Sequence, residues 1–495
     1  MTSPTPDRAP PRRFAILGGG LSGLAAAHRL AELAHETGTP AEIHLYEASG
    51  RLGGLVQTES IGDYVIERGA DSFITNKPGA INLCRRLGLA GDLLSTDPTY
   101  RGSLILHQGQ PIPTPAGFNL LVPGNLLAVL ASPLLSDDGK RRCLDEWFVP
   151  PRTDAGDESL ASFTRRRLGP EVLERIVQPL VGGIYTADPE QLSLAATLPR
   201  FLEMERRHGG LLRAAWNARG PAADGDADQE SERRAERDAA GARYGLFVTP
   251  REGISQLVDR LAERVEAGCT VHRNQPVRGL RVLGPDATNT NRVELQLDSG
   301  AEMFDGVILA LSAEQMAKLL PPDAAPLAAK LRGIPYASSA IVVSGHRLAD
   351  IRHPLDSFGL VIPHVERRKV LAVSFLSRKF PTRAPEGRVV LRTFVGGAMQ
   401  PELYGLSDDA ILKTVREELA DLLGVGGTPD FEVLTRYPRA MPQYHVGHLD
   451  RVREIRSLAA QLGPVYLAGN AFDGVGIPDT IQSGEAAAEA AFSLP

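Results

Sequence analysis

Cysteine is scarce in this chain of 495 residues, and it occurs only at Cys84, Cys143 and Cys269. These positions show neither the paired spacing of a disulfide framework nor the short repeats of a cysteine metal cluster. Long apolar runs are also missing, because no stretch reaches the roughly 18–20 residues that cross a bilayer. Residues 1–13 hold four prolines and three arginines but no apolar core. They predict a disordered lead rather than a signal peptide, so we expect a protein of the reducing cytoplasm.

Basic residues are not in excess. The chain has 54 Lys and Arg against 60 Asp and Glu, a net charge of −6 at pH 7. This balance argues against nucleic acid as the main partner. A hydrophobic fraction of 43% and a charged fraction of 23% are ordinary for a globular protein. The length exceeds what one core usually serves, so two or three domains are expected.

A strand–glycine–helix pattern opens the chain after the lead. The apolar run at 14–17 predicts a buried parallel strand, and 21–35 predict a helix. A G-x-G-x-x-G motif begins between the strand and the helix with Gly18 and Gly20 and ends inside the helix with Gly23. Such glycines form a tight turn, let the backbone approach a pyrophosphate, and pack the helix closely on the strand. The pyrophosphate then lies on the N–H groups of the helix N-terminus.

The residues after the second predicted strand indicate which dinucleotide binds. Residues 42–46 predict a strand that ends at Glu47, near the roughly 20-residue offset of a ribose-binding carboxylate. Residues 51–58 then give R-x-G-G-x-x-x-[ST], which resembles the second signature of amine-oxidase-like flavoproteins. In that signature a glycine pair lets the chain cross near the FAD pyrophosphate, and the arginine adds positive charge. An ordinary Gly-Gly turn is the alternative; we predict FAD.

The C-terminus repeats a nucleotide-facing arrangement. Residues 464–468 predict a strand, 469–479 a glycine-rich loop, and 480–492 are rich in strong helix formers. A site built from both ends of the chain predicts one domain whose sequence is interrupted by another.

Two internal segments stand out by composition. Residues 116–135 are strongly apolar but contain Pro123 and Pro133, which exclude one continuous helix. They predict either a core helix pair lining a large apolar pocket or an exposed patch that dips into a bilayer surface. Residues 217–243 carry many charges of both signs and few large apolar side chains, which predicts a solvated loop or surface helix.

Five further blocks carry a resemblance to a family. They are residues 69–73 (GADSF), 158–169, 178–193, 380–387 with 394–397, and 440–448. Through them the chain resembles, over nearly its full length, the oxygen-dependent protoporphyrinogen and coproporphyrinogen oxidases of haem biosynthesis. Two positions depart from the family pattern: Ala70 replaces the usual proline, and Tyr437 stands where tryptophan is common.

The resemblance implies an α/β fold (α+β overall) with a Rossmann-type FAD domain built from N- and C-terminal segments. It also implies a mixed-sheet substrate domain and a helical membrane-associated domain. The expected boundaries are 1–13 for the disordered lead; 14–85, 245–300 and 430–495 for the FAD domain; 86–115 and 301–429 for the substrate domain; 116–216 for the helical domain; and 217–244 for the charged loop.

The implied reaction oxidises a porphyrinogen to a porphyrin by hydride transfers to non-covalent FAD, which O2 reoxidises to give H2O2. Because the cofactor carries this chemistry, no catalytic side chain is expected, and His445 and His448 are expected to be structural. No metal site is predicted. Further expected partners are a weak contact with the inner face of the cell membrane, and a homodimer or the next haem-pathway enzyme.

The resemblance also assigns residues by position. Substrate contacts are expected at Arg101 for a propionate, Gly183 for a pyrrole N–H, Val361 and Phe380 for the macrocycle faces, and Lys77. Cofactor contacts are expected at Gly18, Gly20, Leu21, Ser22, Gly23, Glu47, Ala48, Arg51, Gly53, Gly54, Gly69, Ala70, Asp71, Ser72, Val277, Tyr437, Gly469, Val475, Gly476 and Ile477.

The choice of porphyrinogen depends on cations. Coproporphyrinogen carries four propionates and protoporphyrinogen two, and Lys77 matches a lysine of Gram-positive coproporphyrinogen oxidases. We therefore favour coproporphyrinogen III over protoporphyrinogen IX, although Lys77 could equally be a surface lysine at a helix start. A flavin amine oxidase or carotenoid desaturase would share Glu47 and the glycine motifs but not blocks 380–387 and 440–448. A non-catalytic FAD-binding module is the remaining alternative.

Overall fold

The computed structural model describes residues 11–154, 156–218, 247–284 and 292–493. Its nucleotide-side sheet has five parallel strands in the order β12-β2-β1-β16-β22. The strands are β1 (Arg12–Leu17), β2 (Ala41–Tyr46), β12 (Thr270–His272), β16 (Gly306–Leu309) and β22 (Val465–Leu467). The strands and helices predicted at the two ends of the chain are therefore present, within a few residues of the expected limits.

Alternate residues of β1 face opposite sides of this sheet. Phe14 and Ile16 pack into one core cluster, whereas Ala15 and Leu17 pack into another. The first side is covered by α1 (Leu21–Thr37), α2 (Pro78–Arg86), α12 (Ser255–Gly268) and α19 (Ile477–Phe492). The second is covered by α13 (Ala313–Leu319), α14 (Ala325–Arg332), α18 (His448–Leu462) and the small sheet β13 (Gly279–Leu283), β14 (Arg292–Leu297) and β15 (Gly300–Phe304). A parallel sheet covered on both faces suits the continuous apolar runs of its strands.

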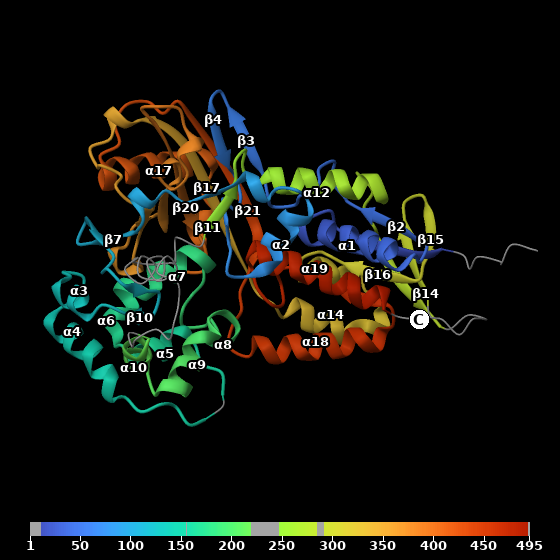
Figure 1. The fold of residues 1–495 in the computed structure, drawn as a ribbon, viewed down its shortest axis with the longest axis horizontal. Helices are drawn as coiled ribbons and strands as arrows, with labels where there is room; N and C mark the ends of the chain where they lie inside the picture. Colours follow the sequence, from blue (N-terminus) through green and yellow to red (C-terminus); the bar gives the residue numbers. More distant parts are fainter. Residues whose placement is uncertain (1–10, 155, 219–246, 285–291, 494–495) are drawn as a thin grey trace, which may run out of the picture.

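A second, larger sheet has seven strands in the order β21-β17-β20-β19-β18-β7-β8. It is mixed, because β7 and β18 pair in parallel while the other neighbours are antiparallel. Its strands are β7 (Leu104–His107), β8 (Gln110–Pro113), β17 (Tyr336–Arg347), β18 (Gly359–Val361), β19 (Ala372–Phe375), β20 (Arg388–Gly396) and β21 (Phe431–Pro442). Helix α17 (Asp408–Leu423) covers one face, and Figure 1 shows this sheet and helix above the helices α3–α10.

Two of the expected domain boundaries are wrong in detail. Strand β16 lies inside the parallel sheet, with Phe14 opposite Gly306, although 301–429 was assigned to the substrate domain. Strand β21 pairs with β17 of the large sheet, although 430–495 was assigned to the FAD domain. Strand pairing between segments that are distant in the sequence decides to which domain β16 and β21 belong.

The helical part between residues 116 and 217 packs around buried rings such as Phe118, Phe163 and Phe201. It contains β9 (Phe118–Asn119), β10 (Val122–Pro123), α3 (Leu126–Ala131), α4 (Asp137–Leu144), α5 (Leu160–Arg167), α6 (Pro170–Val172), α7 (Gln178–Tyr185), α8 (Leu194–Thr197), α9 (Pro199–His208) and α10 (Leu211–Asn217). The charged segment predicted at 217–243 lies outside the described residues after position 218.

The apolar run 116–135 does not form the helix pair that we considered. Two very short strands precede a single helix, α3, whose limits fall between the two prolines. Phe118, Leu121 and Leu134 are buried in the helical core, whereas Leu127 is 78% exposed and Leu130 is 38% exposed. The run is thus partly core and partly surface. Among the described helices, none is both long and apolar enough to cross a bilayer.

Connecting elements complete the fold. They are β3 (Thr58–Ile61), β4 (Tyr64–Glu67), β5 (Phe73–Ile74), β6 (Leu93–Ser95), β11 (Phe247–Pro250), α15 (Leu376–Lys379) and α16 (Pro401–Tyr404).

Candidate functional site

The first glycine loop joins β1 to α1, as the motif predicts. A Cβ added to Gly23 would lie 1.8 Å from the Gly18 carbonyl oxygen, so only glycine lets the helix pack this closely on the loop. Gly20 is different, because its nearest neighbour on that side is the Gly54 Cα at 3.9 Å. Gly20 is also the N-cap of α1 and supplies no capping side chain. Backbone N–H groups at this helix start are therefore available to an anion.

Glu47 lies beside this loop at the end of β2. Its Oε2 accepts a hydrogen bond from the Gly19 N–H at 2.8 Å, and its Oε1 accepts from the Ser49 N–H at 2.8 Å. The carboxylate is thereby fixed in orientation next to the glycine loop. Ala48, the neighbouring predicted contact, is exposed.

The second glycine loop packs against the first. The Gly53 N–H donates to the Gly19 carbonyl at 2.8 Å, and a Cβ on Gly54 would lie 3.1 Å from the Gly20 Cα. Arg51 braces this loop, because its guanidinium donates to the carbonyls of Leu52 at 3.0 Å and Val56 at 2.9 Å, and also to that of Gly54. The two glycine pairs form a backbone surface without side chains, which suits close approach by a pyrophosphate.

Residues 69–72 form the next wall. A Cβ on Gly69 would lie 2.2 Å from the Leu55 carbonyl oxygen and 3.7 Å from the Tyr437 hydroxyl. Gly69 thus lies between the second glycine loop and β21 of the large sheet. Tyr437 is half-buried, and burial raises the pKa of its phenol.

The C-terminal loop runs from β22 into α19. The Gly469 N–H donates to the Ser483 hydroxyl oxygen at 3.0 Å, which ties the loop start to the helix. A Cβ on Gly484 would lie 2.1 Å from the Ser22 carbonyl oxygen, so α19 packs directly on α1. The residues at the start of α19, Val475, Gly476 and Ile477, therefore belong to the same end of the parallel sheet as the first glycine loop. Val277 is a half-buried residue packed against the core cluster that includes α13, two residues after Gln275, whose N–H donates to the Glu47 carbonyl at 3.0 Å.

The predicted substrate residues differ in burial and in their neighbours. Gly183 and Val361 are brought together, because a Cβ on Gly183 would lie 3.8 Å from Val361 Cγ1. Arg101 is exposed just before β7 and makes no hydrogen bond or ion pair with the described residues. Phe380, which is expected to contact the macrocycle, has a ring that is 0% exposed and packs with Tyr64 and Val390, and its substrate contact stays a prediction.

The two histidines of block 440–448 have structural contacts. His448 is buried, stacks on Tyr444 with ring centroids 4.0 Å apart, and lies 3.0 Å from the Phe472 carbonyl through Nε2. Burial lowers the pKa of both His445 and His448. His448 thereby links α18 to the loop before α19.

Several buried charges near the site escaped the sequence reading. Lys379 and Arg392 both contact Asp71, and Arg383 lies 3.6 Å from Glu67. One signal was visible, since Arg392 interrupts an apolar strand, VVLRTFV. Burial raises the pKa of Glu67 to about 7.

The chain matches known proteins over most of its length. The family described as "Flavin containing amine oxidoreductase" matches residues 21–491. Coproporphyrinogen III oxidase of Bacillus subtilis is 32% identical over 96% of this chain and 97% of its own, and protoporphyrinogen oxidase of Homo sapiens is 30% identical over 96% and 98%.

Solved structures show the same architecture. A crystal structure from Exiguobacterium sp. 255-15, provisionally named a protoporphyrinogen oxidase, superposes with a TM-score of 0.82 at 30% identity, covering 97% of this chain and 98% of that one. Reduced UDP-galactopyranose mutase, at 16% identity and a TM-score of 0.69, covers 98% of this chain and 96% of its own, and shares the fold.

Proposed function

The chain belongs to the flavin containing amine oxidoreductase family, and we propose that it is an FAD-dependent oxidase that converts a porphyrinogen to a porphyrin, with O2 as acceptor. The observation that carries this proposal is the near full-length similarity, at 30–32% identity, to relatives named as coproporphyrinogen III or protoporphyrinogen oxidases. The glycine surface around Gly20 and Gly54 supports the cofactor assignment, because any Cβ there would fill space next to a helix N-terminus.

FAD, when bound, supplies the chemistry of this reaction by accepting hydride from the substrate and passing the electrons to O2. The residues of the chain bind and orient. The two glycine loops and the N-termini of α1 and α19 hold the dinucleotide, with Glu47 at the ribose. Side chains with no other task, such as Arg101, hold the charged rim of the substrate.

Coproporphyrinogen III is the preferred substrate in this proposal, and protoporphyrinogen IX the second choice. Lys77 and Arg101 are both exposed cations, which suits the larger number of propionates on coproporphyrinogen. Three relatives named as coproporphyrinogen III oxidases are 32%, 30% and 32% identical to this chain. Gly183 and Val361, which lie in contact range, form the apolar part of the proposed substrate site.

Anaerobic mixing of the purified protein with coproporphyrinogen, protoporphyrinogen and a panel of amines tests the proposal. We expect rapid bleaching of the flavin absorbance with a porphyrinogen, fastest with coproporphyrinogen. Bleaching by an amine alone would overturn the proposal in favour of a flavin amine oxidase. A flavin that none of these compounds bleaches would favour the binding-module alternative.

We also propose that the helical part contacts a membrane surface weakly. Five of the nine exposed large apolar side chains in the described residues belong to it: Leu127, Leu130, Phe148, Ile184 and Trp216. The helical part also carries exposed arginines, including Arg141 and Arg207 with 71% and 70% of their side chains exposed, which pair with Asp138 and Glu203. Apolar side chains with nearby cations favour an anionic lipid surface. Cytoplasmic location, a homodimer and a complex with the next haem-pathway enzyme stay predictions.

A further inference from the structure

Three charged side chains meet between the segment 69–72 and the large sheet. Lys379 Nζ donates to Asp71 Oδ1 at 3.0 Å and to the Ser72 hydroxyl at 2.8 Å. Arg392 donates to Asp71 Oδ2 at 3.0 Å. The side chains of Asp71, Lys379 and Arg392 are 13%, 11% and 4% exposed, so water screens them poorly. We call these three residues the charged triad.

The charged triad lies directly behind the glycine surface. Arg392 also donates to the Gly69 carbonyl, and Gly69 has no room for a Cβ because the Leu55 carbonyl is against it. Leu55 follows Gly54, which in turn lies against Gly20. Unbroken contacts therefore lead from the charged triad to the loops that hold the cofactor.

The charges of the triad do not cancel. Two cations share one carboxylate, and they hold the pKa of Asp71 well below its usual range although burial opposes this. The neighbouring Arg383 lies 3.6 Å from Glu67, which offsets its charge only when Glu67 is ionised, so these two residues add no net negative charge to the triad. One positive charge thus stays in excess in a poorly hydrated region, where charge acts over longer distances than in water.

We propose that Asp71, Lys379 and Arg392 are positioning residues that fix the segment 69–72 against the flavin and whose net charge sets its reduction potential. A net positive charge favours the addition of electrons to a nearby group. The inference rests on the FAD cofactor of the proposed function and is independent of the porphyrinogen assignment.

Reduction potentials of FAD-loaded full-length variants, measured without substrate, test the proposal. Lys379→Met removes a cation and should shift the oxidised/reduced flavin equilibrium about tenfold toward the oxidised form, about −30 mV for a two-electron couple. Asp71→Asn removes the anion and should shift the potential in the opposite direction by a similar amount. The double variant Asp71→Asn/Lys379→Met has the parental net charge. Its oxidised/reduced flavin equilibrium should therefore lie within about threefold of the parental one.

Opposite signs separate electrostatics from loosened packing, because a purely structural role would move both single variants in the same direction. If Asp71→Asn releases its flavin, Lys379→Met alone still gives the sign. A flavin reduction potential of Lys379→Met that is equal to or above that of the parent overturns the proposal. A double variant whose potential equals that of Lys379→Met overturns it as well. A parent protein that binds FAD but oxidises no porphyrinogen would overturn the proposed function and leave this test intact.

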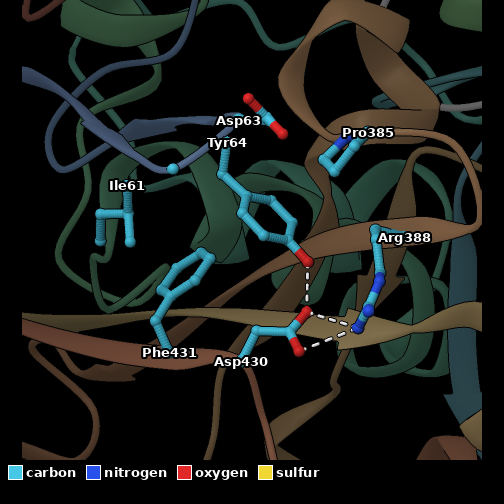
Figure 2. A pocket seen from close by; sticks show the side chains of 8 residues that line it. Ile61, Asp63, Tyr64, Pro385, Arg388, Asp430 and Phe431 are labelled. Atoms are coloured by element: carbon cyan, nitrogen blue, oxygen red, sulfur yellow. Dashed lines mark hydrogen bonds and ion pairs between the residues drawn. The ribbon is translucent and has the colours of Figure 1, made fainter.

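Arg388 provides a matched control on the same strand as Arg392. Figure 2 shows Arg388 and the Tyr64 hydroxyl both directed at Asp430, in a surface hollow lined also by Phe431 and Pro385. Arg388 donates to both oxygens of Asp430 at 2.8 Å, and its side chain is 32% exposed. Arg388→Met removes the same charge four residues away in a hydrated position. We expect less than a twofold change in the flavin equilibrium.

Discussion

Lys77 donates to both carboxylate oxygens of Asp479, at 2.7 and 2.8 Å. Lys77 is the N-cap of α2, and Asp479 lies in the first turn of α19. The lysine side chain is 47% exposed and the carboxylate 15% exposed, so the pair lies at the rim of the structure. The cation proposed to select coproporphyrinogen is therefore already paired, and an arriving propionate must compete with Asp479 for it.

Removing Asp479 should strengthen coproporphyrinogen binding. An exposed ion pair contributes about 0.4–1 kcal/mol, which corresponds to a two- to fivefold lower KM in Asp479→Asn. Lys77→Met should raise the same KM, and protoporphyrinogen should respond less to either change because it has fewer propionates. Steady-state KM values for both substrates check this. If the ratio of the KM for coproporphyrinogen to the KM for protoporphyrinogen is the same in the parent and in Lys77→Met, Lys77 is an ordinary lysine at a helix start.

Gly20→Val should fold but lose FAD. Gly20 has extended backbone angles, φ −73° and ψ 179°, and the nearest heavy atom to an added Cβ is the Gly54 Cα at 3.9 Å. A side chain can therefore be accommodated when no cofactor is bound. The same side chain would occupy the surface that a pyrophosphate approaches. Flavin content and circular dichroism measure the two effects. A folded Gly20→Val protein with full FAD occupancy would refute the location of the site.

Gly23→Ala serves as the contrasting variant. Its Cβ would lie 1.8 Å from the Gly18 carbonyl oxygen, so helix α1 must shift. We expect a loss of about 1–3 kcal/mol in stability, as for overpacked cores, with FAD loss only as a consequence.

Arg101→Ala should weaken catalysis without weakening the fold. Arg101 is exposed and has no polar partner among the described residues, so the folded protein loses no contact. If it pairs with a propionate, kcat/KM should fall roughly 10- to 150-fold, which corresponds to a loss of about 1.4–3 kcal/mol of transition-state stabilisation. Arg101→Lys should recover part of the loss, because an ammonium lacks the planar fork. Unchanged kcat/KM would leave Arg101 as a surface residue.

The sequence was sufficient to predict the strand–glycine loop–helix units at the two ends of the chain. Gly18, Gly20 and Gly23 have a fixed relation to the strand and helix around them, and these elements are local. The membership of β16 and β21 was not predictable in this way, because neither the four residues of β16 nor the twelve of β21 carry a local pattern that selects one sheet. Only pairing with β1 or β17 decides it.

Contacts between distant residues explain the other differences. The charged triad joins positions 308 and 321 residues apart in the chain, and no local pattern links Asp71 to Lys379 or Arg392. Phe380 was assigned from its motif, yet burial depends on the hairpin β3–β4 that packs over it. The sequence around Lys77 does not indicate that its carboxylate partner, Asp479, lies at the opposite end of the chain.

Liposome binding should depend on the exposed face of α3. Leu127 is 78% exposed and Leu130 is 38% exposed, so Leu127→Glu/Leu130→Glu removes apolar surface without opening the core. We expect weaker co-sedimentation with anionic vesicles and little change in unfolding temperature. Leu449→Glu, at a 42% exposed leucine of α18, is the control and should bind as the parent does. A parent protein that binds no vesicles, at low salt, would contradict the membrane proposal.

Glu67 should make the fold less stable as the pH rises toward neutrality. Its side chain is 0% exposed, accepts from the Thr58 hydroxyl at 2.7 Å and from the Ile254 N–H at 3.0 Å, and burial raises its pKa to about 7. In the unfolded chain this carboxyl ionises near its ordinary value of 4.5. Between these values the folded state binds the extra proton, so rising pH lowers stability by up to about 1.4 kcal/mol per unit, and above the folded pKa the effect levels off.

Glu67→Gln isolates this contribution, because the amide stays neutral at every pH and keeps an acceptor oxygen. The parent's free energy of unfolding in urea should fall relative to the variant's by roughly 2–3 kcal/mol between pH 5 and pH 8. Glu59→Gln on the adjacent strand changes a 37% exposed carboxylate paired with Arg68, and its stability should run parallel to the parent's. Parallel curves for Glu67→Gln as well would mean that Glu67 is already ionised at pH 5. Arg383, 3.6 Å away, would then be its effective counter-charge despite the burial of both side chains.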